Sequence, residues 1–278
     1  MSLLSTLAIL AGGLVTGVLG AMVGIGGGVL LVPFLILVMH VPIHHAIGAS
    51  IVAVIATSSA AASAYVRDEL TNIRLGMTLE LATTTGAILG SITAALLSRE
   101  ILSAIFAVFL FITAVSMFRR HEEQSAHVFT EADPGPLGAT YHDPYLKKDV
   151  TYAVRRLPLG MIVSFIAGNV SGLLGIGGGV IKVPAMTLGM GVPMKAAAAT
   201  SNFMIGVTAV ASAYIYYAHG FVDPGVAAPV AIGVFLGALA GTRLSKKVAG
   251  GLLARVLAVV MMVLAVEMGL SAFGISVR

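Results

Sequence analysis

Long apolar runs separated by short polar segments fill both halves of this sequence. The runs of the first half are approximately residues 3–22, 29–39, 46–66, 77–97 and 101–118, and those of the second half are approximately 157–174, 180–190, 196–217, 226–242 and 252–273. Most have about the twenty residues that a helix needs to cross a bilayer. Because the runs are continuous and do not alternate with polar residues, they predict helices and not the strands of a membrane barrel. The pattern therefore predicts an all-α polytopic membrane protein.

The composition supports this prediction and excludes several classes of function. Hydrophobic residues make up 58% of the chain and charged residues only 10%, whereas a soluble domain carries about 25% charged residues. The net charge is +4, but the basic residues lie in short loops with no basic stripe, so we expect no nucleic-acid partner. The chain has no cysteine, which excludes disulfides and cysteine-ligated metals.

A polar stretch at residues 119–156 separates the two apolar halves. It carries many of the chain's charges and the sequence Asp133-Pro134-Gly135-Pro136, which is incompatible with a helix. The sequence thus predicts a first membrane repeat over residues 1–118, a linker over 119–156 and a second membrane repeat over 157–278.

The two halves carry the same glycine-rich motif. Gly-Ile-Gly-Gly-Gly-Val-x-x-Val-Pro occurs at residues 24–33 and again at 175–184, an offset of 151 residues. Two later glycine pairs align at an offset of 147, namely Gly86 with Gly233 and Gly90 with Gly237. Similar residues that recur in the same order indicate a duplicated unit, and we attribute the falling offset to small deletions in loops.

The number of crossings in each half decides how the repeats are related. The runs at 29–39 and 180–190 are too short to span a bilayer alone. If each crosses together with its glycine-rich neighbour, the two halves of five segments are inverted repeats with broken or short helices. If each dips in and returns, the halves are parallel repeats of four spans plus a re-entrant segment.

The distribution of basic residues favours the inverted arrangement. Cytoplasmic loops are enriched in lysine and arginine, and the linker holds six such residues, so we expect the central segment to be cytoplasmic. Five crossings per half then place Arg243, Lys246 and Lys247 inside as well, whereas four spans place them outside.

The glycine motifs have the chemistry of an anion site. A break before a new helix exposes backbone N–H groups at the positive end of the helix dipole, and glycine lets a ligand approach them closely. The candidate cradle residues are Gly26, Gly27 and Gly28 in the first copy and Gly177, Gly178 and Gly179 in the second. The alternative is that these glycines only permit close helix packing.

Lys182 distinguishes the second copy from the first, which has Leu31 at the equivalent position. A lysine inside an apolar segment is costly and often marks a transport pathway, although it can also extend its amino group to the membrane interface. We take Lys182 as a candidate ligand of an anion.

A polar cluster follows the second motif at Thr200, Ser201 and Asn202, and Ser50 occupies the position equivalent to Ser201. These side chains can donate hydrogen bonds to an oxyanion, or they can cap a helix. Glu80 and Glu267 could relay protons or ions, or lie at an interface. The adjacent His44 and His45 lack partners at metal-binding spacing, and no catalytic or nucleotide-binding motif occurs. We therefore expect no enzyme activity, no metal site and no cofactor.

The paired Gly-Ile-Gly-Gly-Gly-Val motifs resemble those of the TauE/SafE family of membrane permeases, the sulfite and sulfonate exporter group. The segments Val-Arg-Arg-Leu-Pro-Leu-Gly at 154–160 and Gly-Val-Pro-Met-Lys at 191–195 are similar as well. The resemblance implies transport of a small sulfur-containing anion, such as sulfite or an organosulfonate, across the inner membrane of a bacterium or archaeon. It does not identify the anion.

These observations together predict a secondary transporter, an exporter of such an anion, in the cell inner membrane. Without a nucleotide-binding motif the driving force is a gradient. Two other hypotheses stay open: a channel-like anion pathway, and a ligand-sensing membrane subunit that does not transport. The expected partners are the anion and membrane lipid, and a homodimer is left open.

Overall fold

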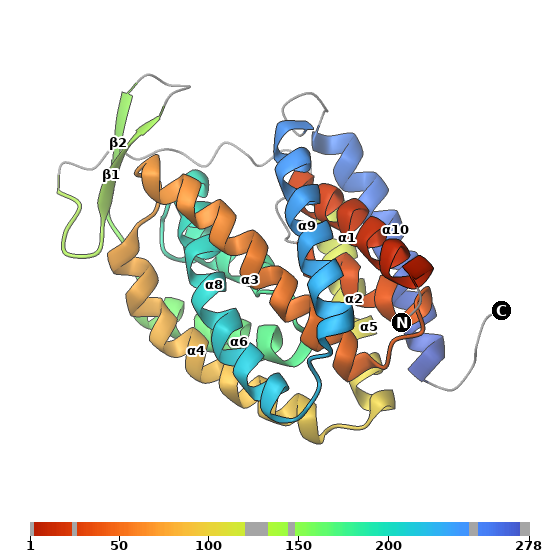
Figure 1. Ribbon diagram of the computed structural model, residues 1–278. Helices are drawn as coiled ribbons and strands as arrows, with labels where there is room; N and C mark the ends of the chain where they lie inside the picture. The colour runs from red at the N-terminus through yellow and green to blue at the C-terminus, as the bar shows by residue number, and fades with distance from the viewer. Residues whose placement is uncertain (1–2, 24–26, 120–132, 144–147, 245–249, 273–278) are drawn as a thin grey trace.

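The computed structural model describes residues 3–23, 27–119, 133–143, 148–244 and 250–272. Long helices dominate this part of the chain, with a two-stranded hairpin beside them (Figure 1). The elements are α1 (Leu3–Val23), α2 (Gly28–Leu37), α3 (Ile43–Arg67), α4 (Ile73–Leu96), α5 (Arg99–Arg119), β1 (Ala139–Asp143), β2 (Lys148–Tyr152), α6 (Leu157–Leu174), α7 (Gly179–Pro184), the π-helix η1 (Ala185–Gly189), α8 (Met194–Ala218), α9 (Pro224–Leu244) and α10 (Gly250–Ala272).

The helices have the lengths that a membrane requires. Within the described residues, seven helices are long and apolar enough to cross a bilayer. Gly28–Leu37, Gly179–Gly189 and Val256–Ala272 form shorter apolar helices. The prediction of an all-α polytopic membrane protein is confirmed, and the two runs predicted to be too short are short helices.

Local sequence explains where several helices begin and end. Asn72 caps α4, because its side-chain oxygen accepts a hydrogen bond from the Leu75 amide at 3.0 Å. α6 ends at Leu174 and is capped by Gly175, whose φ of 69° is left-handed and whose backbone N–H donates a hydrogen bond to the Ser171 carbonyl at 2.7 Å. The glycine motif thus stops one helix and starts the next.

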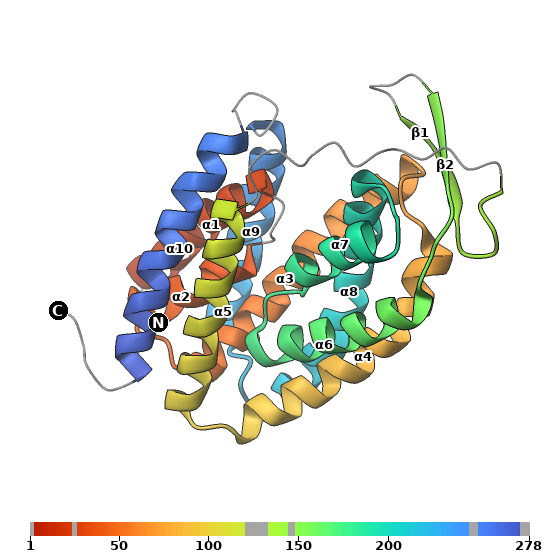
Figure 2. The same cartoon turned by 180° about the vertical axis from the view of Figure 1, so that it is seen from behind.

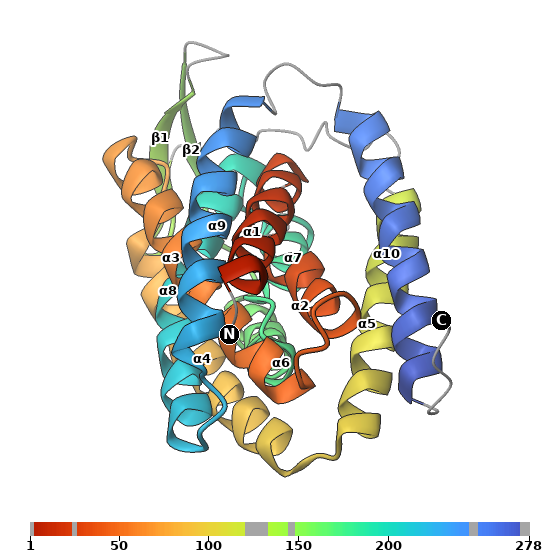
Figure 3. The ribbon, with the colours of Figure 1, turned by 45° about the vertical axis from the view of Figure 1, so that its right-hand side comes forward.

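The helices pack in pairs that join the two halves. α1 packs on α9 and α4 on α6, while α3 packs on α8 and α5 on α10; Figure 2 shows α4 beside α6. If each helix is replaced by its equivalent in the other half, the contact of α1 with α9 becomes that of α6 with α4. The contacts of α3 with α8 and of α5 with α10 stay the same, as expected for repeats related by a twofold axis. In Figure 3, α5 and α10 lie side by side and run in opposite directions, which favours inverted over parallel repeats.

The offset between the repeats is constant, so the predicted fall to 147 is wrong. α3 and α8 are both 25 residues long and begin 151 residues apart. A Cβ on Gly86 would collide with the Phe165 carbonyl, and one on Gly237 would collide with the Leu14 carbonyl. Gly86 and Gly237 are 151 positions apart, and so are their partners Leu14 and Phe165. Gly86 therefore corresponds to Gly237 and not to Gly233.

The error of four residues is about one helical turn, and the glycine spacing explains it. α9 carries glycines at three successive turns, Gly233, Gly237 and Gly241, and each approaches the backbone of α1. Such small residues let membrane helices pack closely. Because they repeat every four residues, two sequences can be aligned one turn out of register.

The linker contains a hairpin that the sequence did not reveal. β1 and β2 are antiparallel, with Tyr141 opposite Val150. Both side chains and Tyr152 are buried against residues of α4, η1 and the start of α8. Asn72 anchors the hairpin, because its Nδ2 donates hydrogen bonds to the Leu137 carbonyl at 2.8 Å and to the Tyr152 hydroxyl at 3.2 Å.

Candidate functional site

The second glycine motif is an irregular break between α6 and α7. Gly177 and Gly178 have φ values of 79° and 71°, in the left-handed region that glycine adopts without strain. α7 begins at Gly179 and passes into η1 at Ala185. In the first motif, Gly27 precedes the start of α2 at Gly28, and Gly26 lies outside the described residues.

The two motifs meet inside the protein. A Cβ on Gly28 would lie 2.8 Å from the carbonyl oxygen of Gly175 and 2.9 Å from Ser50 Oγ. Ser50 itself is fully buried and donates a hydrogen bond to that Gly175 oxygen at 2.8 Å. A Cβ on Gly178 would lie 2.9 Å from the Ala167 carbonyl oxygen. Gly28 and Gly178 therefore serve close packing, whatever else they do.

A pocket of about 120 Å³ lies beside this meeting point, between the two halves. That volume is several times the roughly 10–15 Å³ that one water molecule requires. The wall is formed by α1 (Gly17, Gly20, Ala21), Gly27, α3 (Val54, Thr57, Ser58, Ala61, Tyr65), the second motif and α7 (Ile176, Gly179, Val183), α8 (Ala198, Ser201, Asn202, Ile205) and α9 (Ala238).

Four residues predicted for the site line this pocket: Gly27, Gly179, Ser201 and Asn202. Ser201 is buried, and its hydroxyl has no hydrogen-bond partner among the described residues. Asn202 is half-buried and uses one N–H of its side chain on the Ala198 carbonyl, at 2.9 Å. An amide nitrogen carries two hydrogens, so both residues have a donor left for a ligand.

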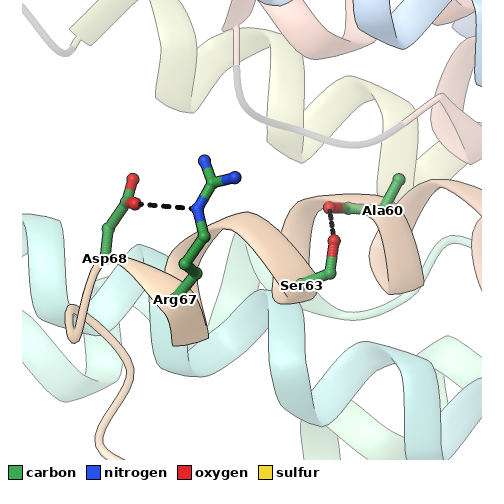
Figure 4. Close-up of polar contacts among 4 residues, drawn as sticks. All are labelled: Ala60, Ser63, Arg67 and Asp68. Atoms are coloured by element: carbon green, nitrogen blue, oxygen red, sulfur yellow. Dashed lines mark hydrogen bonds and ion pairs between the residues drawn. The ribbon is translucent and has the colours of Figure 1, made fainter.

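Sequence reasoning missed the wall that α3 supplies. Thr57, Ser58 and Tyr65 line the pocket, but they stand among alanines and serines, a composition that is as typical of close helix packing as of a transport pathway. The wall extends toward the polar end of α3. There Ser63 donates to the Ala60 carbonyl at 2.8 Å and the exposed Arg67 pairs with Asp68 at 3.5 Å (Figure 4).

Three other predicted residues lie away from the pocket wall. Ser50 holds the Gly175 carbonyl, as described above. Thr200 is fully buried and its hydroxyl oxygen accepts a hydrogen bond from the Asn72 amide at 3.0 Å. Lys182 is only 1% exposed, and its Cε lies 3.4 Å from the position that a Cβ on Gly178 would occupy.

Lys182 has a charged neighbour in the other half. Glu80 of α4 is 4% exposed, and its charge lies near enough to that of Lys182 to interact with it, although no salt bridge joins the two side chains in the described part of the chain. Its Oε1 accepts hydrogen bonds from Thr84 at 2.8 Å and from Thr208 of α8 at 2.6 Å. Glu80 Oε2 and Lys182 Nζ have no hydrogen-bond partner among the described residues. The sequence had given Glu80 only as one of two candidate relays.

Comparison with known proteins identifies the family. The family model described as Sulfite exporter TauE/SafE matches residues 9–268. The chain belongs to this family. The match covers both glycine motifs, the pocket and the Glu80–Lys182 pair, so the site described above is built from the part of the chain that the family shares.

Curated relatives of this TauE/SafE chain carry names of membrane transporters. The "Probable membrane transporter protein YunE" of Bacillus subtilis is 27% identical over 245 residues, covering 84% of this chain and 86% of the relative. A "Probable membrane transporter protein" of Xylella fastidiosa is 29% identical over 238 residues, covering 85% and 83%. The "Sulfite exporter TauE/SafE family protein 1" of Arabidopsis thaliana is 36% identical over 87 residues, covering 31% and 19%. No solved structure matches the chain.

Proposed function

We propose that this TauE/SafE chain exports a small sulfur-containing anion, such as sulfite or an organosulfonate, across the cell inner membrane. The observation that carries the proposal is the pocket between the two halves, which is lined by residues of both glycine motifs and of the equivalent helices α3 and α8. Ligand sites of transporters built from inverted repeats lie at such an interface.

The lining of the pocket suits a small oxyanion with an apolar part. Ser201 and Asn202 offer hydrogen-bond donors, and bonds to a charged acceptor are stronger than bonds between neutral groups. Val54 and Ile205 give the pocket an apolar side, which would accept the carbon chain of an organosulfonate. The described lining residues carry no full charge, so the anion is not held too tightly to leave.

The membrane potential can drive export without further coupling. A cytoplasm that is negative inside favours the exit of an anion by about 2.3 kcal/mol per charge per 100 mV. The two halves would rock around the pocket and expose it to each side in turn. In this proposal the linker and its hairpin lie in the cytoplasm. The anion enters the pocket from the side where α3 ends at Arg67.

Flux into proteoliposomes tests the proposal. The purified protein is reconstituted, a potassium gradient with an ionophore sets the potential, and sulfite, sulfate, thiosulfate, taurine, sulfoacetate and acetate are compared. We expect saturable, voltage-dependent movement of a sulfur anion and little movement of acetate. If no sulfur anion moves, the proposal fails, and a flux that does not saturate indicates a channel.

Asn202→Ile provides a matched pocket variant. The first repeat has Ile51 at the equivalent position, so the α8 helix is expected to tolerate the change. Loss of the amide donor should raise the KM for the transported anion on the order of tenfold, the effect of one hydrogen bond to a charged group. An unchanged KM would remove Asn202 from the site.

A further inference from the structure

The pocket is open in only one of two positions that the repeats make equivalent. Thr57 and Tyr65, which line it, are half-buried. The residues 151 positions later are Thr208 and Tyr216, and they are 0% and 1% exposed. Tyr216 also donates a hydrogen bond to the Leu173 carbonyl at 3.3 Å. The region beside α8 that the repeat makes equivalent to the pocket is therefore closed.

Glu80 and Lys182 lie against residues that form this closed region. The Glu80 carboxylate accepts the 2.6 Å hydrogen bond from Thr208, the equivalent of pocket-lining Thr57. Lys182 Cε lies 3.4 Å from the Cβ position of Gly178, the equivalent of pocket-lining Gly27. Each of the two charged side chains thus lies against one residue whose repeat equivalent lines the open pocket.

The open side has no such charges. The equivalents of Lys182 and Glu80 at the constant offset are Leu31 and Ala231. Leu31 is fully buried and Ala231 is half-buried. Both charged residues are present beside the closed region, and both are replaced by apolar residues beside the open pocket. We therefore treat Glu80 and Lys182 as one functional pair. A lysine and a glutamate that compensate each other reduce the cost of burying either charge.

The pair is incompletely satisfied. Lys182 Nζ, Glu80 Oε2 and the Ser212 hydroxyl are buried, and none has a hydrogen-bond partner among the described residues. Such groups lower stability where they stay dry. Water or a ligand anion entering this region would supply the missing partners, as expected of a pathway that opens at another stage of the cycle.

We propose that this region is a second anion-binding site, closed in this conformation, in which the Lys182 ammonium binds the substrate anion. Until the anion arrives, the Glu80 carboxylate, held by Thr208, compensates the charge of the lysine. When α8 moves away from α4 and α6, the substrate anion reaches Lys182 and replaces the nearby Glu80 carboxylate as the charge that compensates the lysine. The inference rests on the proposed transport function and adds a charge exchange to it. This role would explain the asymmetry between the repeats, because Lys182 and Glu80 are charged whereas their equivalents Leu31 and Ala231 are apolar.

Cysteine labelling tests whether the pair keeps the second anion-binding site closed. The chain has no cysteine, so Ser212→Cys and its equivalent Ala61→Cys each introduce a single thiol. In detergent, a water-soluble maleimide should label position 61 at least about tenfold faster than position 212, because only the pocket side is open. Glu80→Gln keeps the shape of the side chain but removes its charge, and should accelerate labelling at 212 on the order of tenfold.

Matched variants separate this effect from general loosening. Glu267→Gln removes an exposed carboxylate on α10 and should not change labelling at 212. The double variant Glu80→Ala/Lys182→Leu copies the apolar pair beside the open pocket, and should fold and keep position 212 slow. The proposal is overturned if 212 already reacts as fast as 61, or if Glu80→Gln acts no more strongly than Glu267→Gln.

Equilibrium binding tests whether Lys182 is an anion ligand. Sulfite, measured by calorimetry, should bind Glu80→Gln on the order of tenfold more tightly than the unchanged protein, because no carboxylate competes for the lysine. Lys182→Met in the Glu80→Gln background should remove the gain. Absence of sulfite binding to Glu80→Gln overturns the second anion-binding site even if the unchanged protein transports, whereas failure of transport itself is seen only in the flux panel.

Discussion

The hydroxyl of Ser50 donates a 2.8 Å hydrogen bond to the carbonyl oxygen of Gly175, and so ties α3 of the first half to the glycine break of the second. Its repeat equivalent, Ser201, lines the pocket and has no partner among the described residues. The two serines at the same position of the repeat thus differ in role: Ser50 binds a backbone carbonyl, and Ser201 faces the pocket.

Replacing each serine by alanine should separate stability from binding. Ser50→Ala leaves the buried Gly175 carbonyl without its partner and should cost about 1–3 kcal/mol. Ser201→Ala should change stability by less than about 0.5 kcal/mol but raise the KM of the transported anion. Thermal unfolding and proteoliposome flux measure the two effects. Equal losses of stability in both variants would contradict the division.

Gly178→Ala should destabilise the protein more than Gly220→Ala. Both glycines have left-handed backbone, with φ of 71° and 74°, so both variants bear roughly 1–2 kcal/mol of strain. Only at Gly178 would the new methyl group also meet the backbone, 2.9 Å from the Ala167 carbonyl oxygen, whereas nothing lies within 4 Å at Gly220. Unfolding temperatures of the two variants give the packing contribution by difference. Equal shifts would show that the glycine break tolerates a side chain.

Thr57→Val should weaken transport without unfolding the protein. The change keeps the shape of the side chain but replaces a hydroxyl of the pocket wall by a methyl group. Because this hydroxyl already donates its one hydrogen to the Ala53 carbonyl and must turn away from it to reach an anion, we expect the KM to rise only about threefold. Thr93→Val is the control: Thr57 and Thr93 both donate to a carbonyl in the preceding turn of their own helix, but Thr93 is exposed on α4. The same rise in KM in both variants would argue against a role for the α3 wall.

Alkaline pH should release the linker hairpin. Burial raises the pKa of the Tyr152 phenol above its ordinary value of 10.0, and the hydrogen bond from Asn72 opposes this only in part. The folded state therefore favours the neutral phenol. The stability that depends on it is present below pH 10 and is lost as the pH rises through the higher folded-state pKa.

Tyr152→Phe tests this sign. The unchanged protein should lose unfolding temperature above about pH 10, and the phenylalanine variant should lose less over the same range. Exposed Tyr214 and Tyr217 on α8 provide control variants that should leave the profile unchanged. Parallel pH profiles for the unchanged protein and Tyr152→Phe would exclude the phenol as the cause.

Reporter fusions test the inverted arrangement. Five crossings in each half place a C-terminal reporter outside the cell and a reporter inserted in the linker inside it. Four spans per half place the linker and the C-terminal reporter on the same side. A cytoplasmic C-terminal reporter would therefore contradict the inverted model that the opposed α5 and α10 favour.

Part of the candidate site was accessible from the sequence because its signals are local. The duplicated glycine motif identified both helix breaks, and the polar cluster of the second half identified Ser201 and Asn202. Lys182 was identified for the same reason, since a charge in an apolar run is visible without a structure. The α3 wall was not, because threonine, serine and tyrosine among alanines are as typical of helix packing as of a pathway.

The sequence by itself determined the membrane class, the duplication and the places where helices break, because hydrophobicity and glycine act within a single segment. Only the tertiary structure decided the register of the repeats, since glycines spaced by one helical turn permit two alignments and the contacts of Gly86 and Gly237 permit one. It also decided which serine binds backbone and which lines the pocket. The tertiary structure alone also decided that Glu80 lies near Lys182, because the distance between residues a hundred positions apart depends on how the helices pack.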